Sequence, residues 1–449
     1  MRSFIRLILI LVGLAAAGAL FLYLNQESAT LSVEEGYGPS PSLPEPNPEL
    51  IPTVNIAEAS QWQDGETPTA ATGLAVNAFA ADLDHPRWLH VLANGDVLVA
   101  ESNRPEKEDQ GFSLRDWAMG FFMGRAGAEV PSANRITLLR DTDGDGTAET
   151  RSVLLENLNS PFGMTLANGR LYVANTDAIL AFPYRDGDTK IAAPGEKIAD
   201  LPAGPINHHW TKDVIASPDG SKLYATVGSN SNVGENGMDA EHNRAAVLEI
   251  DVATKNVRLF ASGLRNPNGL SWNPDTGELW VAVNERDEIG SDLVPDYMTS
   301  VRDGGFYGWP YSYYGRHVDD RVEPQRPELV ERAIVPDYAL GAHTASLGLT
   351  FNKGTQLGAL YANGAFVGQH GSWNRRPRSG YKVIFVPFVN GKPSGDPLDV
   401  LTDFIGPDGK ARGRPVGVAI DGRGSLLVAD DVGNTIWRVS VAAPPRPAS

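Results

Sequence analysis

Residues 85–100 read His-Pro-Arg-Trp-Leu-His-Val-Leu-Ala-Asn-Gly-Asp-Val-Leu-Val-Ala. Two short apolar stretches flank an Asn-Gly pair in this segment. That arrangement predicts a β-hairpin, because Asn-Gly fits the tight turn between two paired strands. The same pattern recurs five more times: a polar or small residue at the start, a turn of Gly, Asn or Asp, and an apolar ending similar to Leu-Val-Ala. The five further copies start near Ser160, His209, Asn266, Ser346 and Arg414.

Six hairpins at an average spacing of roughly 60 residues indicate a repeat architecture. An all-β, six-bladed β-propeller over residues 76–441, with long connecting loops, explains this spacing. Two stacked sandwiches would also contain many strands, but they would not repeat one phrase. The 47 glycines and 32 prolines support the propeller, because turn-forming residues at this density exclude a mainly helical protein.

The charge and the cysteine count exclude several classes of function. The chain has 38 Lys and Arg against 55 Asp and Glu, which gives a net charge of −17. A surface this acidic has no general basic field with which to neutralise phosphates, so we expect no nucleic-acid partner. The absence of cysteine excludes disulfide scaffolds, thiolate metal sites and cysteine catalysis.

The two ends of the chain are predicted to lie outside the propeller. Arg2 and Arg6 precede residues 7–24, which carry no charge and would span about 27 Å as a helix. This predicts a transmembrane anchor in the inner membrane, with residues 1–6 in the cytoplasm and the main domain in the periplasm. A cleaved signal peptide is the alternative. The proline-rich residues 25–75 are predicted to form a linker that acts as a spacer, and residues 442–449 a tail.

Polar residues stand just before several of the predicted inner strands. In a propeller these positions surround one central channel, although they are far apart in sequence. Arg, Asn and His gathered there indicate an anionic, oxygen-rich ligand rather than packing. The residues concerned are Arg87, His208, His209, Arg265, Asn266, His343, Arg412 and Arg414.

Four motifs in this order resemble the quinoprotein sugar dehydrogenases of the soluble glucose dehydrogenase and sorbosone dehydrogenase type. They are Leu-Asp-His-Pro-Arg-Trp at 83–88, Asn-Glu-Arg-Asp-Glu at 284–288, Gly-Gly-Phe-Tyr-Gly-Trp-Pro at 304–310 and Ala-Asp-Asp-Val-Gly-Asn-Thr at 429–435. The resemblance implies a six-bladed propeller that uses pyrroloquinoline quinone (PQQ) and Ca²⁺. It also implies oxidation of an aldose or a sorbosone-like sugar aldehyde, with a quinone or a cytochrome as electron acceptor.

The resemblance also implies roles for particular residues. His209, shortly before a Pro-Asp-Gly turn, matches the general base that takes the sugar hydroxyl proton, and a histidine pKa suits that task. Its neighbour His208 is the alternative base. Arg265 and Asn266 match the pair beside the quinone oxygens, where a fixed cation would stabilise developing negative charge. The acidic residue that supports the histidine in soluble glucose dehydrogenases corresponds to Ser229 here.

Three further arginines match cofactor-binding positions of the same family. Arg412 and Arg414 correspond to an Arg-x-Arg clamp for the cofactor carboxylates, which a guanidinium can bind in bidentate fashion. Relatives have a lysine in a Gly-Ser-x-Lys phrase, whereas this chain reads Gly-Ser-Trp-Asn-Arg at 371–375. Arg375 is expected either to replace that lysine or to leave the contact unmade.

Two calcium sites are considered. Glu285 and Arg286 lie in the segment whose backbone carbonyls hold Ca²⁺ in the family, so this site rests on resemblance alone. Independently, the loop 141–149 has carboxylates at the first, third and fifth positions and a glycine at the sixth, as in an EF-hand. Its twelfth position is Ser152 rather than Glu, so an acidic hairpin turn is the alternative. The candidate ligands are Asp141, Asp143, Asp145 and Glu149.

Two other functions and one unassigned segment complete the hypotheses. A Ca²⁺-dependent propeller lactonase would need carboxylates around the channel, where this chain offers Arg and His. A non-catalytic propeller scaffold would have no need of arginines at the strand starts. Residues 113–127 are short, apolar and helix-like; they could form a lid, a core plug or a membrane-touching patch, and packing on the propeller is favoured.

Overall fold

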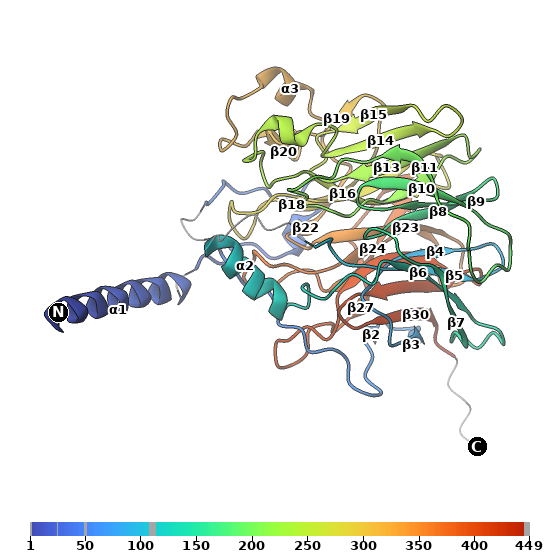
Figure 1. The fold of residues 1–449 in the computed structure, drawn as a ribbon, viewed down its shortest axis with the longest axis horizontal. Coiled ribbons are helices and arrows are strands. Elements are labelled where there is room, and N and C mark those ends of the chain that lie inside the picture. Colours follow the sequence, from blue (N-terminus) through green and yellow to red (C-terminus); the bar gives the residue numbers. More distant parts are fainter. Residues whose placement is uncertain (1, 25, 49–51, 107–113, 444–449) are drawn as a thin grey trace.

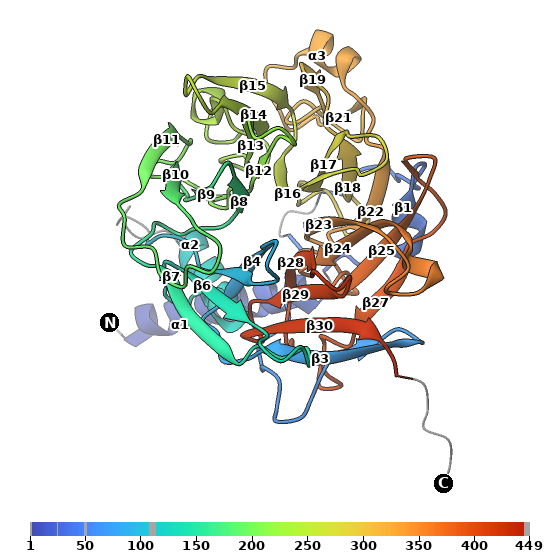
Figure 2. The ribbon, with the colours of Figure 1, turned by 90° about the vertical axis from the view of Figure 1, so that its right-hand side faces the viewer.

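Six blades of four antiparallel strands each form a ring in the computed structural model, which describes all residues except 1, 25, 49–51, 107–113 and 444–449. Short additional strands extend three of these sheets to five, five and six strands. Figure 2 shows the ring with its innermost strands β4, β8, β12, β16, β23 and β28 around the centre. The predicted six-bladed propeller is confirmed. The first five blades take their four strands in chain order, joined by hairpin turns and by a few longer connections, whereas blade six takes one strand from the start of the domain.

The blades contain the following strands. Blades one and two hold β4 (Pro86–Val91), β5 (Val97–Glu101), β6 (Arg135–Arg140) and β7 (Thr150–Leu155), then β8 (Met164–Ala167), β9 (Arg170–Ala174), β10 (Ala178–Pro183) and β11 (Glu196–Asp200). Blades three and four hold β12 (Val214–Ala216), β13 (Lys222–Val227), β14 (Ala246–Asp251) and β15 (Val257–Ser262), then β16 (Asn266–Trp272), β17 (Leu279–Asn284), β18 (Pro295–Ser300) and β22 (Tyr338–Ala342). Blade five holds β23 (Ser346–Lys353), β24 (Asn363–Gln369), β25 (Lys382–Val389) and β27 (Leu398–Thr402).

Blade six closes the ring with strands from both ends of the domain. It holds β28 (Pro415–Ile420), β29 (Leu426–Asp430) and β30 (Thr435–Val441), and its outermost strand is β3 (Leu74–Ala80). β3 pairs antiparallel with β30, with Val76 opposite Val439. This pairing covers the edge of β30, which would otherwise expose unpaired backbone groups.

Smaller elements decorate the ring. The short strands are β1 (Tyr37–Gly38), β2 (Thr69–Ala70), β19 (Gly305–Phe306), β20 (Ser312–Tyr313), β21 (His317–Val318) and β26 (Lys392–Pro393). The helices are α1 (Arg2–Leu24), α2 (Leu114–Arg125) and α3 (Pro327–Arg332), with 3₁₀ turns at Glu34–Gly36, Met238–Glu241 and Ala359–Tyr361. Figure 1 shows α2 on one face of the ring.

The core lies between the blades, because both faces of most strands are covered by neighbouring sheets. β5 and β29 are buried along their whole length, and β17 is buried at every residue except the last, Asn284. This explains why the endings of the repeat are continuous apolar runs rather than alternating ones. Each apolar side chain that is fully removed from water adds roughly 1.5–3 kcal/mol of stabilisation relative to an exposed one.

The chain ends differ from the sequence prediction. Residues 7–24 do lie in a helix, α1. Within the described part of the chain, however, no helix has the combination of length and apolar character needed to cross a membrane. The predicted transmembrane anchor is therefore not supported.

The predicted linker is not a free spacer. Its residues 26–48 and 52–66, which we call the strap, hydrogen-bond to the propeller through their backbone: Ala29 N to Arg376 O, Asn47 N to Ile289 O, and Asn55 N to Trp373 O. A proline-rich segment is compatible with this docking as well as with a spacer. Prolines keep the chain extended, and its backbone groups, which make no hydrogen bonds with one another, can then bind to the propeller. The strap's Ala57 is fully buried against blade-five and blade-six residues.

Candidate functional site

His209 lies in an irregular loop that leads into β12, the inner strand of blade three. Its Nδ1 is 2.8 Å from the backbone oxygen of Ser229 and 3.1 Å from the Ser229 hydroxyl. Because a carbonyl oxygen can only accept a hydrogen bond, Nδ1 carries the proton and Nε2 keeps a lone pair. Burial, followed by the charges of Arg265 and His208, holds the pKa of His209 well below its usual value. The ring is therefore neutral at neutral pH.

Arg265 and Asn266 stand at the start of β16, beside His209. The Ser229 backbone N–H donates to the Arg265 carbonyl at 2.7 Å, and a Cβ on Gly228 would lie 2.4 Å from Asn266 Oδ1 and 2.5 Å from His209 Cβ. Glycine at 228 therefore allows the two side chains to approach the same stretch of backbone. The predicted grouping of His209, Arg265 and Asn266 is present in the structure.

The guanidinium of Arg265 is almost fully buried, at 3% exposure. Nη1 donates to the Glu285 carbonyl at 2.5 Å, and Nη2 donates to Asn232 Oδ1 at 2.9 Å. Its nearest carboxylate oxygen is on Asp287, at a longer 3.4 Å. Arg265 is thus oriented mainly by neutral oxygens, so much of its positive charge remains available to a ligand.

His343, just before β23, is joined to the same group through Asp287. Its Nδ1 is 3.0 Å from Asp287 Oδ1, and its Nε2 is 3.0 Å from the Gly290 carbonyl. Burial alone would lower the pKa of His343, but the hydrogen bond to Asp287 and the charge of that carboxylate outweigh it and raise the pKa. Both ring nitrogens of His343 thus face acceptor oxygens, an arrangement that favours the doubly protonated ring and leaves no lone pair free to act as a base.

Asp431 centres another cluster, where blades five, six and one meet. It accepts from Arg87 Nη1 at 2.5 Å and from His370 Nε2 at 2.9 Å, and His85 Nε2 lies 3.5 Å away. The Arg87 guanidinium also lies 5.7 Å from the ring centroids of both Phe162 and Trp210. Since Trp210 follows His209, Arg87 is close to the segment that carries the candidate base. Sequence analysis missed Asp431 and His370, whose spacing shows no pattern.

The three cofactor arginines are placed differently from one another. Arg414 is buried at the start of β28, where Nη2 donates to the strap's Ala57 carbonyl at 3.1 Å and the Tyr381 ring lies 4.8 Å away. It forms no ion pair with any carboxylate among the described residues. Its charge lowers the pKa of His370, which hydrogen-bonds to Asp431, so Arg414 lies near the Asp431 cluster; its predicted role in binding the cofactor stays a prediction.

Arg375 and Arg412 contact the strap rather than the His209 group. Arg375 donates to the Leu31 carbonyl at 2.9 Å and to the Pro377 carbonyl at 2.8 Å. Arg412 lies 3.4 Å from Glu66 and 5.8 Å from the ring centroid of Trp62. The structure therefore gives both side chains a role in holding the strap, and it does not bring Arg375 to the candidate base.

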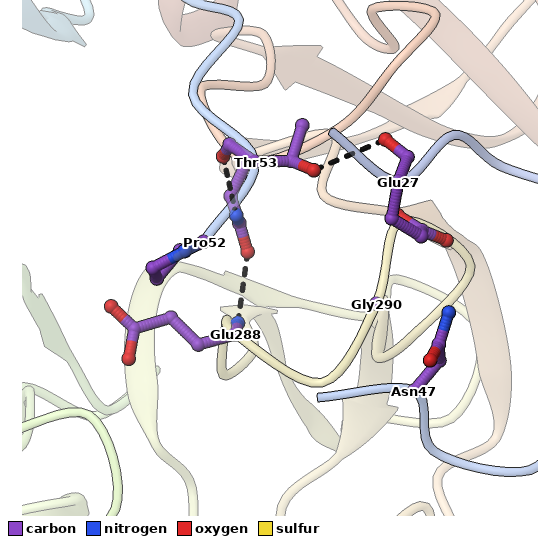
Figure 3. Close-up of a pocket in the computed structure, with 7 residues that line it drawn as sticks. Glu27, Asn47, Pro52, Thr53, Glu288 and Gly290 are labelled. Carbon is purple, nitrogen blue, oxygen red and sulfur yellow. Dashed lines mark hydrogen bonds between the residues drawn. The ribbon is translucent and has the colours of Figure 1, made fainter. Parts of the chain in front are cut away.

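The strap also meets the loop that carries Asp287. Asn374 bridges the two: its Nδ2 donates to the Thr53 carbonyl at 2.6 Å, and its Oδ1 accepts from the Glu288 N–H at 2.8 Å. Figure 3 shows Thr53 and Glu288 at the two ends of these hydrogen bonds. Thr53 in turn donates to the Glu27 carbonyl at 3.1 Å. These contacts enclose a cavity of only about 10 Å³, which has room for about one water molecule.

The first calcium hypothesis meets a competing cation. The Glu285 carbonyl already accepts from Arg265, and the Glu285 carboxylate pairs with Arg286 Nε at 3.0 Å. Arg286 is itself fully buried and also pairs with Asp319 at 3.1 Å. A Ca²⁺ ion on the Glu285 carbonyl would require the Arg265 guanidinium to turn away, so calcium at this place stays a prediction.

The second calcium hypothesis concerns a different part of the molecule. The carboxylates of Asp141, Asp143, Asp145 and Glu149 offer oxygens that all lie within 4.8 Å of one another. Their loop joins β6 to β7, so it lies on the face opposite to the starts of the inner strands. Arg423 pairs with Asp141 there at 3.0 Å. The loop is therefore remote from His209, and its function as a calcium site stays a prediction.

The segment predicted at 113–127 is described from residue 114 onward and packs beside the strap. It contains α2, and since it connects the end of β5 to the start of β6, it belongs to the face where the inner strands begin. Its Arg125 carbonyl accepts from Ala59 N, and its Arg125 guanidinium pairs with Glu58 at 2.5 Å. Gly127 lies against Ala59 and Val432. The expected packing of this segment on the propeller is present, through the strap.

Comparisons with known proteins agree with this fold. A family model described as a domain of unknown function, DUF7133, matches residues 69–372, and a model described as TrAA12-like matches residues 328–442. The PQQ-dependent pyranose dehydrogenase of Coprinopsis cinerea is 42% identical over 289 residues, which cover 55% of this chain and 39% of that enzyme. The chain thus matches well under half of the length of this relative.

Two solved structures show the shared fold. The calcium structure of the Trichoderma reesei enzyme of carbohydrate-active enzyme family AA12 superposes with a TM-score of 0.68 at 18% identity, covering 87% of this chain and 99% of that one. The holo PQQ domain of the Coprinopsis cinerea pyranose dehydrogenase gives a TM-score of 0.67 at 19% identity, covering 86% and 100%. The resemblance to PQQ-dependent sugar dehydrogenases is confirmed.

Proposed function

The chain belongs to the family described as a domain of unknown function, DUF7133, and from this premise we propose that it is a PQQ-dependent dehydrogenase of an aldose or a sorbosone-like sugar aldehyde. The observation that carries the proposal is His209: a neutral histidine whose Nε2 keeps its lone pair, beside Arg265 and Asn266. A homologous enzyme that uses PQQ to oxidise pyranoses supports the choice of cofactor.

The residues at the inner-strand starts fit an anionic cofactor rich in oxygen atoms. Fifteen buried side-chain polar atoms have no hydrogen-bond partner within the described residues, and three of them belong to the residues at the inner-strand starts: Arg87 Nε, Asn266 Oδ1 and Arg414 Nε. Since buried polar groups are usually paired, a ligand that reached these three atoms would supply partners that the chain does not. Arg265 and Asn266 would hold the quinone side of PQQ, and Arg414 a carboxylate. When bound, PQQ supplies a quinone that accepts a hydride.

The chain's own residues perform the proton chemistry in this proposal. His209 Nε2 takes the hydroxyl proton of the sugar, and general-base catalysis of this kind is worth about 10²–10⁴-fold in rate. Ser229 keeps the ring in the tautomer that can accept this proton. The buried Arg265 cation stabilises negative charge that develops next to it, more strongly than it would in water.

The test uses residues 26–449, so that the strap is retained. Reconstitution with PQQ, with and without Ca²⁺, should give quinone absorbance and dye reduction with members of an aldose panel. His209→Ala should lower kcat by at least about 100-fold and leave PQQ affinity unchanged, whereas the matched control His208→Ala should keep its activity. Failure to bind PQQ at micromolar concentration would exclude the proposal. Full activity of His209→Ala would exclude His209 as the base.

We further propose that the domain works outside the cytoplasm and passes electrons to a quinone or a cytochrome. The complete absence of cysteine agrees with an exported protein that is stabilised by ring closure. Fractionation of cells that express a tagged full chain tests the location. Comparison of a soluble quinone analogue with cytochrome c as acceptors, in the reconstituted enzyme, tests the electron transfer.

A further inference from the structure

Lys212 is a lysine with no exposed surface, three residues after the candidate base. Lysine is almost never fully buried unless a carboxylate pairs with it, because an ammonium group loses much hydration energy on burial. Within the described residues, no carboxylate lies within ion-pairing distance of Lys212 Nζ. The charged groups that influence it are Arg244, which disfavours an ammonium, and Asp177, which favours one.

The Nζ of Lys212 has two partners, and both are backbone carbonyls of the segment that carries the base. It donates to the His209 carbonyl at 3.1 Å and to the Trp210 carbonyl at 3.1 Å. A neutral amine has two N–H donors, and these two acceptors occupy both of them, whereas an ammonium would keep a third donor without an acceptor among the described residues. In agreement, burial and then the charge of Arg244 lower the pKa of Lys212 well below its usual value.

The position of His209 depends on such contacts, because residues 201–213 form neither helix nor strand. Ser229 holds the imidazole ring, but a ring contact alone leaves the backbone of the loop free to shift. Lys212 holds that backbone from the interior, and Thr176 Oγ1 adds a hydrogen bond to the Trp210 carbonyl at 2.9 Å. Together these contacts determine where Nε2 points.

We propose that Lys212 is a positioning residue: a buried neutral amine that holds the backbone carbonyls of His209 and Trp210 and so aims the Nε2 of His209. This inference rests on the proposed role of His209 as base. It adds that the base is held at two points, at its ring by Ser229 and at its backbone by Lys212. A displacement of about 1 Å at a reacting group can cost about 100-fold in rate.

The test compares Lys212→Met with Lys222→Met in the chain 26–449. Methionine matches the length of lysine without its donors, and Lys222 lies on β13 of the same blade, where it pairs with Glu249 near the surface. We expect kcat of Lys212→Met to fall by about 10–100-fold, with KM and PQQ affinity within about twofold of the parent, and Lys222→Met to behave as the parent. Unchanged kcat, or a parallel loss of PQQ binding, would overturn the positioning role.

A second measurement needs no catalysis. In the cofactor-free parent, ¹⁵N NMR should show Lys212 Nζ as a neutral amine at pH 7 and His209 as one tautomer with the proton on Nδ1. In Lys212→Met the His209 signals should broaden or report both tautomers. An ammonium signal for Lys212 overturns the proposal even where Lys212→Met does not fold. Failure to bind PQQ would mean that the proposed function has failed, whereas the NMR result does not depend on the cofactor. If His209→Ala retains activity, His209 is not the base, and a positioning role of Lys212 for catalysis is overturned with it.

Discussion

Ser229 holds the imidazole of His209 through a carbonyl oxygen and a hydroxyl group rather than through a carboxylate. The hydroxyl is itself fixed, because it donates to the Ser231 carbonyl at 2.6 Å. This arrangement selects the tautomer of His209 without stabilising its protonated form. It agrees with the low pKa of His209, which has cationic neighbours and no paired carboxylate.

A carboxylate at position 229 should therefore change the pH dependence of activity. In Ser229→Asp, a negative charge beside Nδ1 stabilises the imidazolium and raises the pKa of His209. A base must be unprotonated to act, so the acidic limb of the kcat/KM profile should move to higher pH than in the parent. The measurement is kcat/KM from pH 4 to 9. Ser229→Ala is the control, since it keeps the carbonyl and adds no charge, and its acidic limb should stay within about half a pH unit of the parent. An unmoved limb in Ser229→Asp would mean that another group controls the profile.

The residues that sequence predicted best are those whose neighbours are close in the chain or in the repeat. His209, Arg265 and Asn266 each precede an inner strand, and propeller symmetry brings such positions together. Arg375 could not be placed in the same way, because its partner Leu31 comes from a segment that has no repeat and no apolar period. Lys212 also gave no signal, since a lysine before a strand is ordinarily exposed.

At the scale of elements, Arg412 and Arg414, which stand just before the inner strand β28, make different contacts. Arg412 contacts Glu66 and Trp62 of the strap, whereas Arg414 turns to the interior, where its Nε has no partner within the described residues. Both were predicted to bind the cofactor. In a regular strand, residues two positions apart point to the same side, but residues 412–414 form no strand here, so the spacing alone did not show that the two guanidinium groups have different partners.

Substitution of these two arginines should distinguish their roles. Arg414→Gln should weaken PQQ affinity about 10–100-fold, the loss expected when a charge-assisted hydrogen bond worth about 1.5–3 kcal/mol is removed. Arg412→Gln should leave PQQ affinity within about threefold of the parent and increase proteolysis of the strap. The measurements are PQQ titration by absorbance and limited proteolysis. Equal losses of PQQ affinity in both variants would show that Arg412 also binds the cofactor.

The elements themselves were predicted to different extents. The two inner strands of each blade were recognisable, because a turn and two apolar runs are local signals. The outer strands were harder to recognise. β22 follows β18 only after a long connection that includes α3, and β3 joins blade six from the other end of the domain. Long-range pairing of this kind leaves little trace in a single sequence.

At the scale of the whole molecule, segments near the start of the chain complete the last blade and pack against it. β3 covers the edge of β30, and Trp62 of the strap donates to Asp430 at 2.7 Å and packs edge-on against Phe404 and Trp437. Ring closure therefore depends on β3, and the packing beside the candidate site depends on the strap. These two segments are neighbours near the start of the domain, with β2 between them in the chain.

Two truncations should distinguish ring closure by β3 from packing of the strap. A chain that starts at residue 68 loses the strap but keeps β2 and β3, so it should fold with a lower thermal midpoint. A chain that starts at residue 82 also loses β3; the unpaired edge of β30 should then promote aggregation. Circular dichroism melting and size-exclusion chromatography provide the comparison. If both truncated chains were monomeric with the same midpoint, β3 would not be needed for closure.

The pairing of β3 with β30 also sets an order of events during protein synthesis. β3 leaves the ribosome before any strand of its own blade has been made, whereas blades one, two, three and five can form from local hairpins as they emerge. Blade six becomes complete only when Val441 has been added. Until then β3 is an unpaired strand on a nascent chain, and the polypeptide reaches its closed form only at the end of translation or after it.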